Sequence, residues 1–252
     1  MKRFVVLLVG IPLVYCTSPK EQPAEITYTM KDFRLESKGG CRADTMQCAY
    51  YQVRYPEFSG LDTAVTRKLQ GRIDESVSMG NPEAEGRSMQ EIGSGFVGDF
   101  DTFKTEMPDL ASGWYYTATV GVEISADTLI SLVVEEEYYT GGAHGGHGTY
   151  FISLNPATGE PYTLSQFLKE GYEEPLRLLG EQVFRDVRSI PEPESLQENN
   201  FEFPDDRFQL NQNYGFRKEG IAFFYNSYEI APYAAGPTEV LIPYEALREW
   251  IR

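Results

Sequence analysis

A glycine-rich segment at residues 138–150 (YYTGGAHGGHGTY) constrains the fold of this chain most strongly, because it holds five glycines and both histidines of the protein. Residues 129–139 (LISLVVEEEYY) lead into it and residues 149–154 (TYFISL) leave it, and both are rich in β-branched and aromatic residues. Such composition favours strands. Glycine adopts positive φ angles and allows close backbone approach. We therefore predict a β-hairpin with an elaborate loop, in which Gly141 and Gly142 are candidates for positive φ.

The remaining pattern predicts a mixture of strands and helices. Residues 26–37 (ITYTMKDFRLES) and 49–55 (AYYQVRY) alternate apolar and polar side chains, which is typical of an antiparallel pair. Asp62 can cap one amphipathic helix, a second helix is indicated from about Ser88, and a third is indicated within residues 175–187. We expect an α+β fold in which antiparallel sheets carry helices on one face and the domain has two parts.

The first residues have the layout of an export signal. Lys2 and Arg3 precede an apolar run at residues 4–14, and Cys16 follows, in a sequence (LVYC) close to a bacterial lipoprotein cleavage box. Tyr15 departs from that box, which normally has a small residue before the cysteine, and an ordinary signal peptide cut near Cys16 is the alternative. We predict a bacterial cell envelope protein that is lipid-anchored and faces the periplasm or the exterior. The predicted segments are a signal peptide at residues 1–15 and a lipidated tether at residues 16–25.

Two cysteines remain, Cys41 and Cys48, and in an exported chain such a pair is expected to form a disulfide. The enclosed segment is short, so the bridge would fix a loop locally more than it would stabilise the whole fold. A metal-binding cysteine pair is the alternative, but it lacks two further ligands nearby.

The charge and the motifs limit the possible functions. Loss of Lys2 and Arg3 with the signal would leave 20 basic and 38 acidic residues, a net charge of −18. Such a charge disfavours nucleic acid as a partner and favours cationic ones. The sequence has neither a Gly-x-Ser-x-Gly motif nor a cysteine–histidine pairing with a free thiol, and its carboxylates are too numerous to indicate a glycosidase pair. We therefore expect a non-catalytic protein without a cofactor.

Two segments hold the candidate site residues. His144 and His147 could bind a metal only with a distant carboxylate such as Glu135 or Glu137, and we predict no metal site. The alternatives for His144 are a backbone hydrogen bond that locks the loop and direct contact with a ligand. Residues 225–236 (YNSYEIAPYAAG) combine residue types suited to a rigid contact surface, although their tyrosines could equally belong to the core.

Three motifs share their order and spacing with a known family: residues 139–144 (YTGGAH), residues 155–168 (NPATGEPYTLSQFL) and residues 224–244, which begin FYNSYEIAPYAAG and end VLIPY. The chain resembles the extracytoplasmic domain shared by the anti-sigma factor RsiV and the non-catalytic N-terminal part of the peptidoglycan deacetylase PdaC. The resemblance implies a PdaC-like α+β domain at residues 26–112 and an RsiV-like α+β domain at residues 113–252. It also implies a binding module, with lysozyme as the partner in RsiV-like proteins. The predicted ligand-binding residues are Tyr139, Gly141, Gly142, His144, Tyr225, Tyr228, Pro232 and Tyr233.

Two departures from the family narrow this expectation. An RsiV-like factor needs a sigma-binding segment and a spanning helix, and only fifteen residues precede Cys16; a PdaC-like deacetylase needs a catalytic domain after the module, and this sequence ends at Arg252. We therefore expect neither sigma control nor deacetylation. The alternative to a protein-binding module is a module that binds peptidoglycan or another cell-wall glycan.

Overall fold

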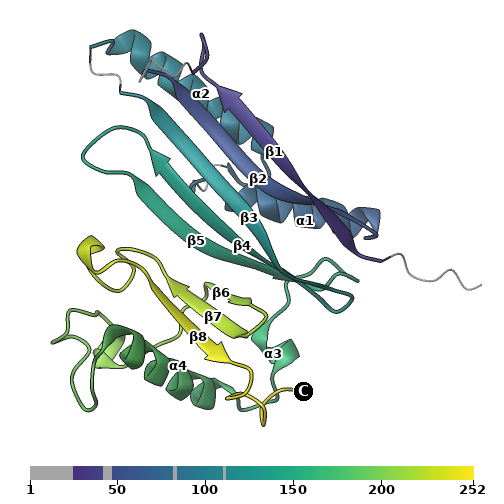
Figure 1. Ribbon diagram of the computed structural model, residues 1–252, viewed down its shortest axis with the longest axis vertical. Helices are drawn as coiled ribbons and strands as arrows, with labels where there is room; N and C mark the ends of the chain where they lie inside the picture. Colours follow the sequence, from purple (N-terminus) through teal and green to yellow (C-terminus); the bar gives the residue numbers. More distant parts are fainter. Residues whose placement is uncertain (1–24, 42–46, 82–83, 110–111) are drawn as a thin grey trace, which may run out of the picture.

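The structure, a computed structural model, describes residues 25–41, 47–81, 84–109 and 112–252. A five-stranded sheet lies above a three-stranded sheet in the view of Figure 1, and helices accompany both sheets. The predicted α+β fold class is confirmed. The signal peptide and the lipidation site predicted at Cys16 lie outside the described residues. Within the described ranges, no helix has both the length and the apolar character needed to cross a membrane.

The larger sheet follows the order of its strands in the chain, and all neighbours are antiparallel except β2 and β3. These two run parallel, with Ala49 opposite Trp114, so the predicted antiparallel arrangement does not hold at this pair. The reason is the connection, because two helices between β2 and β3 return the chain to the end of the sheet where β2 began. The strands are β1 (Thr27–Glu36), β2 (Ala49–Ser59), β3 (Trp114–Ala126), β4 (Leu129–Tyr139) and β5 (Gly146–Leu154).

The two crossover helices cover one face of this sheet (Figure 1). Helix α1 (Thr63–Ser76) has Asp62 as its N-cap, and α2 (Met89–Glu106) begins after Ser88, which forms a capping box with Glu91. Both helix starts were therefore predicted correctly, since a capping side chain satisfies N–H groups that the helix cannot. The buried stripes of the two helices are Val65, Leu69 and Ile73, and Ile92, Phe96 and Phe100.

The opposite side of the sheet, where Tyr50, Thr117 and Glu137 point, is called the open face below. Residues that alternate along a strand point to opposite faces, and the paired residues Tyr51 and Tyr116, like Val120 and its partner Val134, lie in the core beneath the helices. No helix that the structure describes covers the open face (Figure 1). The small sheet packs against part of it, where the Phe216 N–H donates to Ser131 Oγ over 3.2 Å, and elsewhere on this face Glu135 and Glu137 are exposed.

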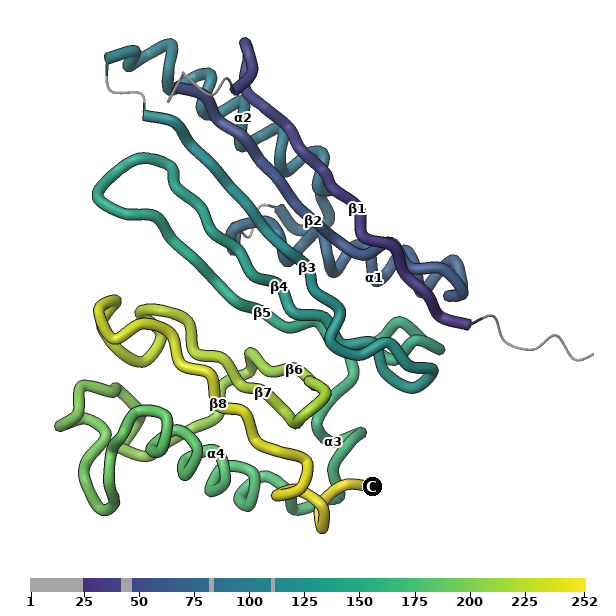
Figure 2. The backbone as a smooth tube through the Cα atoms, in the orientation of Figure 1, coloured from purple at the N-terminus to yellow at the C-terminus, as the bar shows by residue number. Residues whose placement is uncertain are grey.

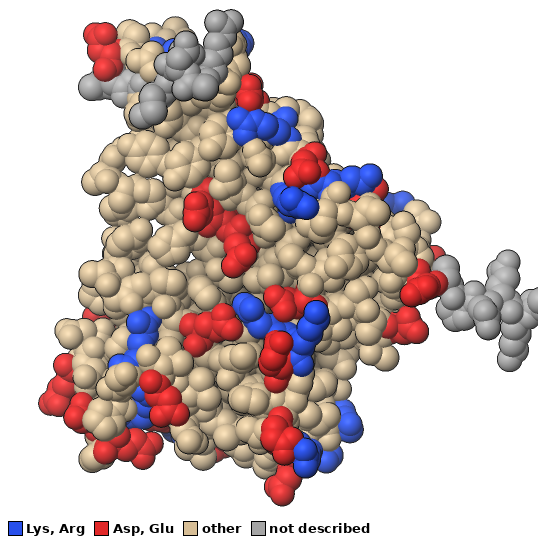
Figure 3. Space-filling view, in the orientation of Figure 1, with Lys and Arg blue, Asp and Glu red and all other residues tan. Residues whose placement is uncertain are grey.

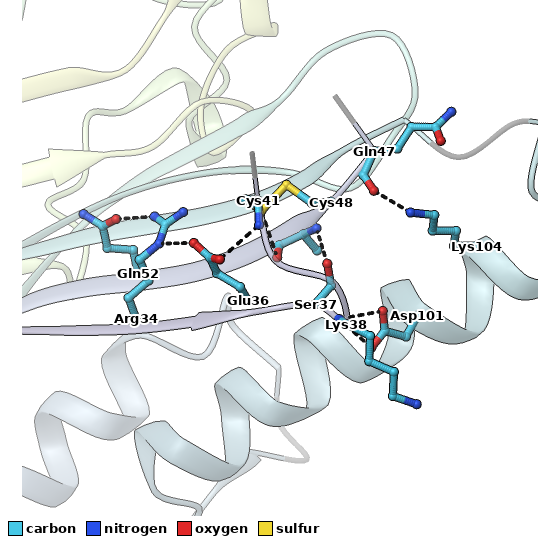
Figure 4. The surroundings of a disulfide bond; sticks show 11 residues. Arg34, Glu36, Ser37, Lys38, Cys41, Gln47, Cys48, Gln52, Asp101 and Lys104 are labelled. Atoms are coloured by element: carbon cyan, nitrogen blue, oxygen red, sulfur yellow. Dashed lines mark hydrogen bonds and ion pairs between the residues drawn. A yellow bond between two sulfur atoms is a disulfide. The ribbon is translucent and has the colours of Figure 1, made fainter. Parts of the chain in front are cut away.

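A disulfide joins Cys41 and Cys48 in the connection between β1 and β2 (Figure 4). The backbone N–H of Cys41 donates to Glu36 Oε2 over 3.0 Å, and the N–H of Ala49 donates to Ser37 Oγ over 2.9 Å. The last turn of α2 also contacts this connection, because Lys104 Nζ donates to the carbonyl of Gln47 over 2.7 Å. The bridge closes this one connection, and its role in fixing the loop locally stays a prediction.

The second part of the chain builds its own core around an antiparallel sheet of three strands, with α4 packed against it. Phe184 from α4 meets Phe203, Phe208 and Tyr225 there, with ring centroids 5.2 to 6.3 Å apart. The elements are α3 (Leu164–Phe167), α4 (Glu173–Arg188), a 3-10 turn η2 (Pro204–Asp206), β6 (Tyr214–Phe216), β7 (Gly220–Tyr225), a 3-10 turn η3 (Tyr233–Ala235) and β8 (Thr238–Pro243).

The two parts meet along β5, which lies beside the small sheet in the tube view of Figure 2. Asn213 Nδ2 donates to the carbonyl of Thr149 over 2.8 Å, so a side chain of the second part takes an edge position on β5. The predicted domain division at residues 112 and 113 falls between β2 and β3, which share the larger sheet. The two buried clusters separate further along the chain, with β5 mainly in the first.

Candidate functional site

The two segments singled out in the sequence come together in space. We call residues 138–150, between and at the ends of β4 and β5, the glycine loop, and residues 225–236, between β7 and β8, the tyrosine loop. The His144 ring stacks on the Tyr233 ring with centroids 4.7 Å apart and planes at 24°. His147 lies 5.7 Å from the same ring, and Tyr228 lies 5.4 Å from it. These four residues, His144, His147, Tyr228 and Tyr233, form what we call the two-loop cluster.

Hydrogen bonds hold the two loops in register. Asn226 Oδ1 accepts from the N–H of Thr149 over 2.8 Å, and Asn226 Nδ2 donates to the carbonyl of Thr149 over 3.1 Å. The Asn226 amide therefore pairs with the edge of β5 as a neighbouring strand would. His147 Nε2 also lies 3.0 Å from Ser227 Oγ. These hydrogen bonds connect the two loops to each other, so the rings of the cluster are attached to a defined backbone.

The backbone of the glycine loop needs its first two glycines. Gly141 has a φ of 95° and Gly142 a φ of 99°, so both of the candidates adopt a positive φ. Residues with a side chain adopt such angles only at an energetic cost. The Tyr139 hydroxyl donates to the carbonyl of Gly142 over 3.0 Å, which fixes the turn from one end. His144 Nδ1 lies 2.8 Å from the carbonyl of Gly145, which agrees with the loop-locking alternative for this histidine.

The tyrosine loop is held by Arg188, which sequence analysis did not identify. Its guanidinium donates to the carbonyls of Ala235, Gly236 and Pro237 over 2.9, 3.1 and 2.8 Å. Its Nε donates to Thr238 Oγ1 over 2.9 Å, and burial lowers the pKa of the guanidinium. The sequence gives one hint of this role, which is that Arg188 directly follows the helix predicted at residues 175–187.

The predicted contact residues differ in exposure. Tyr228 is 65% exposed and has a φ of 69°, a strained conformation for a tyrosine. Pro232 is exposed, and Tyr233 is half-buried beside the other three rings of the cluster. Tyr225, in contrast, is only 1% exposed and its hydroxyl donates to the carbonyl of Gln209, which corrects its assignment as a contact residue. The alternative role weighed for these tyrosines, a place in the core, applies to Tyr225.

Glu229 also has a structural role in the tyrosine loop. Its carboxylate accepts from the N–H of Asn226 over 2.9 Å and from Asn211 Nδ2 over 2.7 Å. The first bond spans three residues of the loop and closes it on itself. Glu229 therefore shapes the loop that presents Tyr228 and Tyr233.

A cavity of about 400 Å³ opens beside the cluster, between the open face and the small sheet. His147 belongs both to its wall and to the cluster, so the two features are continuous. The wall carries side chains from β3, β4 and β5 and from the two residues that flank the tyrosine loop: Thr117, Thr119, Glu135, Glu137, His147, Phe224 and Pro237.

The arrangement does not resemble a catalytic or metal centre. His147 and Ser227 have the spacing of a base and a nucleophile, but among the described residues no carboxylate is within ion-pair distance of the His147 ring. In the same part of the chain, no three histidine, cysteine, aspartate or glutamate side chains are grouped to hold a metal ion. The arrangement found is one of stacked rings on a fixed backbone, which suits contact with another molecule.

In comparisons with known proteins, family models match both parts of the chain. Residues 43–147 match the family model described as deacetylase PdaC, and residues 165–245 match the model of a protein of unknown function, DUF3298. No curated protein matches.

Among solved structures, a member of the DUF3298 family from Bacteroides fragilis is similar with a TM-score of 0.68 and 19% identity, over 91% of this chain and 95% of that one. A DUF3298 family protein from Pseudomonas aeruginosa is similar with a TM-score of 0.60 and 18% identity, over 92% and 95%. At these identities the structures support a shared fold, and the resemblance found in the sequence motifs is confirmed by the two family models.

Proposed function

Because the chain joins a PdaC-like region to a DUF3298 region, we propose that it is a non-catalytic binding protein of the bacterial cell envelope. Its two-loop cluster would contact a cationic protein partner, and the family resemblance makes lysozyme the candidate. The observation that carries this proposal is the stacking of His144, Tyr233 and Tyr228 across two loops that are far apart in the sequence.

The cluster has the properties of a pre-organised contact surface. Aromatic side chains provide much contact area while losing few rotamers, and they dominate the binding energy of many interfaces. Arg188 and Asn226 already hold the loop backbone, so little further ordering is needed on binding. Pro232 and Tyr228 are exposed beside the half-buried Tyr233. We expect Tyr233 to be the anchor and its exposed neighbours to exclude water around it.

Charge supports a basic partner. The whole sequence has 38 acidic and 22 basic residues, and removal of the proposed signal would make the excess of negative charge larger still. Opposite net charge accelerates encounter and is screened by salt, whereas buried anchors determine how slowly the complex dissociates. A strongly basic lysozyme fits this pattern.

The glycan-binding alternative finds less support on the open face. Tyr50, Tyr115 and Tyr139 form a ladder there, with ring centroids 6.0 and 6.2 Å apart and planes at 19° and 28°. Rings stacked on each other turn their faces toward their neighbours, and the Arg34 guanidinium covers Tyr50 at 4.2 Å. Sugars stack on the free faces of aromatic rings, so this ladder offers them mainly edges.

Isothermal titration of the mature chain with a basic lysozyme, at low and moderate salt, tests the proposal. We expect binding that weakens as salt rises and, in Tyr233→Ala, a loss of about 2 kcal/mol, or about thirtyfold in affinity. Tyr28→Ala is the matched control, because Tyr28 is an exposed tyrosine on β1, outside the cluster. No heat at either salt concentration would refute the lysozyme proposal, and binding of peptidoglycan fragments would then favour the glycan alternative.

The anchoring of the protein is proposed from the sequence alone. Cys16 would carry the lipid, and the polar segment after it would link the lipid to β1. The variant Cys16→Ala should move from the membrane to the soluble fraction, and full retention in membranes would show that lipid is not the anchor.

A further inference from the structure

We propose that the cavity beside the two-loop cluster binds one arginine side chain of the cationic partner. This inference rests on the proposed function for the identity of the partner, but the chemistry of the cavity can be tested without that partner. The cavity lies on the open face and is lined by Glu135, Glu137, Thr117, His147 and Phe224.

The two glutamates give the cavity its charge. Glu135 and Glu137 are two residues apart on β4, so both point to the open face, and both are exposed. Neither forms an ion pair with any cation in the described part of the chain. Figure 3 shows this face, with acidic side chains near its centre. A cation from another molecule would therefore meet two carboxylates that are free to bind it.

Two arginines of this protein show how a guanidinium is bound beside its strands. Arg34 lies 4.2 Å over the Tyr50 ring and donates to Glu36 Oε1 over 2.8 Å. Arg217 lies 5.5 Å over the Phe151 ring and forms ion pairs of 3.6 and 3.2 Å with carboxylates of β3 and β8. Each site combines an aromatic ring with at least one carboxylate, which is a favourable setting for arginine.

The cavity combines the same two parts without an arginine of its own chain. Phe224 provides the ring, and Glu135 and Glu137 provide the carboxylates, while the Thr117 and Thr119 hydroxyls add acceptors. Arginine suits this set better than lysine, because its planar group can donate to two carboxylates and stack at once. The volume of about 400 Å³ is near the lower end for ligand sites, so it fits one side chain with water better than a folded segment.

The side chain of Arg54 lies near enough to compete with an external guanidinium. Arg54 is on the open face of β2, and Thr119 of β3 lies between it and Glu135 in the sheet register. Strands are about 4.8 Å apart, so about 10 Å separates the two backbones. If Arg54 partly neutralises the cavity, its removal should strengthen the binding of an external guanidinium.

The test uses N-acetyl-arginine amide as the probe and N-acetyl-citrulline amide, which has nearly the same shape but no charge, as its control. Amide chemical shifts of Thr117, Glu137 and His147 report binding in the mature protein. We expect saturable millimolar binding of the arginine probe, little response to citrulline, and a loss of about tenfold or more in the double variant Glu135→Gln, Glu137→Gln. The variant Glu245→Gln, Glu249→Gln changes the net charge equally at exposed positions outside the cavity and should bind like the wild type.

The outcomes separate this inference from the proposed function. Equal shifts with arginine and citrulline, or unchanged arginine binding in the Glu135 and Glu137 double variant, would overturn the inference. If lysozyme binds the wild type and that double variant equally, the proposed function stands and the arginine site fails. If the arginine probe binds in the cavity but lysozyme does not bind at all, the arginine site stands and lysozyme is excluded as the partner.

Discussion

Arg188 offers the sharpest test of how the candidate site is held, because one side chain fixes the end of the tyrosine loop. Its substitution by alanine removes donors to the carbonyls of residues 235, 236 and 237 and to the Thr238 hydroxyl. It also removes a guanidinium 5.2 Å from the Phe201 ring. The loop would keep the hydrogen bonds of Asn226 and Glu229 near its start and the bond from the Glu202 N–H to the Ile230 carbonyl, but residues 235–237 would lose their side-chain donor.

The loss of stability in Arg188→Ala depends on which of the four acceptors water can reach once the guanidinium is removed. Hydrogen bonds to a charged donor contribute about 1.5–3 kcal/mol when their loss leaves a buried group unpaired. The carbonyls belong to residues that are exposed or half-exposed, so water can replace Arg188 there. Thr238 is only 2% exposed, and its hydroxyl loses a partner in a dry environment. The unpaired Thr238 hydroxyl and the lost contact with the Phe201 ring together predict that Arg188→Ala destabilises the protein by about 2–4 kcal/mol.

Chemical denaturation gives the free energy of unfolding, and hydrogen exchange of the amides at residues 226–237 shows whether the loop has loosened. Arg188→Lys keeps the charge but cannot reach several acceptors at once, so it should be intermediate. Arg207→Ala is the control, because Arg207 is 60% exposed and its ion pair with Glu174 is on the surface. If Arg188→Ala unfolds like the wild type and exchanges its loop amides at the same rate, the hydrogen bonds of Arg188 are not what holds this loop.

Two further predictions concern stability. Gly142→Val should destabilise the protein by about 1–3 kcal/mol because of the positive φ at Gly142, whereas Ala143→Val in the same loop should change the melting temperature little; equal melting of both variants would contradict the strained backbone. Burial raises the pKa of the Glu136 carboxyl, to which the Tyr116 hydroxyl donates over 2.7 Å. Because the folded pKa is above the unfolded pKa near 4.5, protonated Glu136 contributes its full stabilisation below pH 4.5. That contribution is lost as the pH rises through the folded pKa. Glu136→Gln should therefore melt higher than the wild type at neutral pH, with the difference shrinking toward pH 4, and a difference that does not change with pH would refute this.

Local signals in the sequence were sufficient for the helix starts and the longer strands but not for the pairing of the strands. Asp62 and Ser88 marked helix starts correctly because capping is decided within a few residues. The parallel pairing of β2 and β3 was not predictable from alternation, which reports one buried face and says nothing about the neighbouring strand. The strand Tyr214–Phe216 has three residues, too few for any periodicity to appear.

In the candidate site, too, properties of single residues were predictable from the sequence and contacts between distant residues were not. The glycines predicted positive φ because that property belongs to single residues, and the structure has it at Gly141 and Gly142. Whether a tyrosine is in the core depends on what packs against it: Tyr225 shares a strand face with Phe223 and is buried, while Tyr228 is exposed in the loop. The pairing of His147 with Ser227 spans 80 residues and had no local signal.

The position of the cluster also gives a reason for the two regions to occur in one chain. His144 lies within the residues matched by the PdaC model, and Tyr233 lies within those matched by the DUF3298 model. Each ring covers the other, and the Asn226 amide that aligns the loops belongs to the second region while its partner Thr149 belongs to β5. Neither region alone contains the stacked surface, so a partner that recognises it recognises the junction. The cavity proposed for arginine adjoins the same junction, because its floor is the open face and its far wall is Phe224 and Pro237.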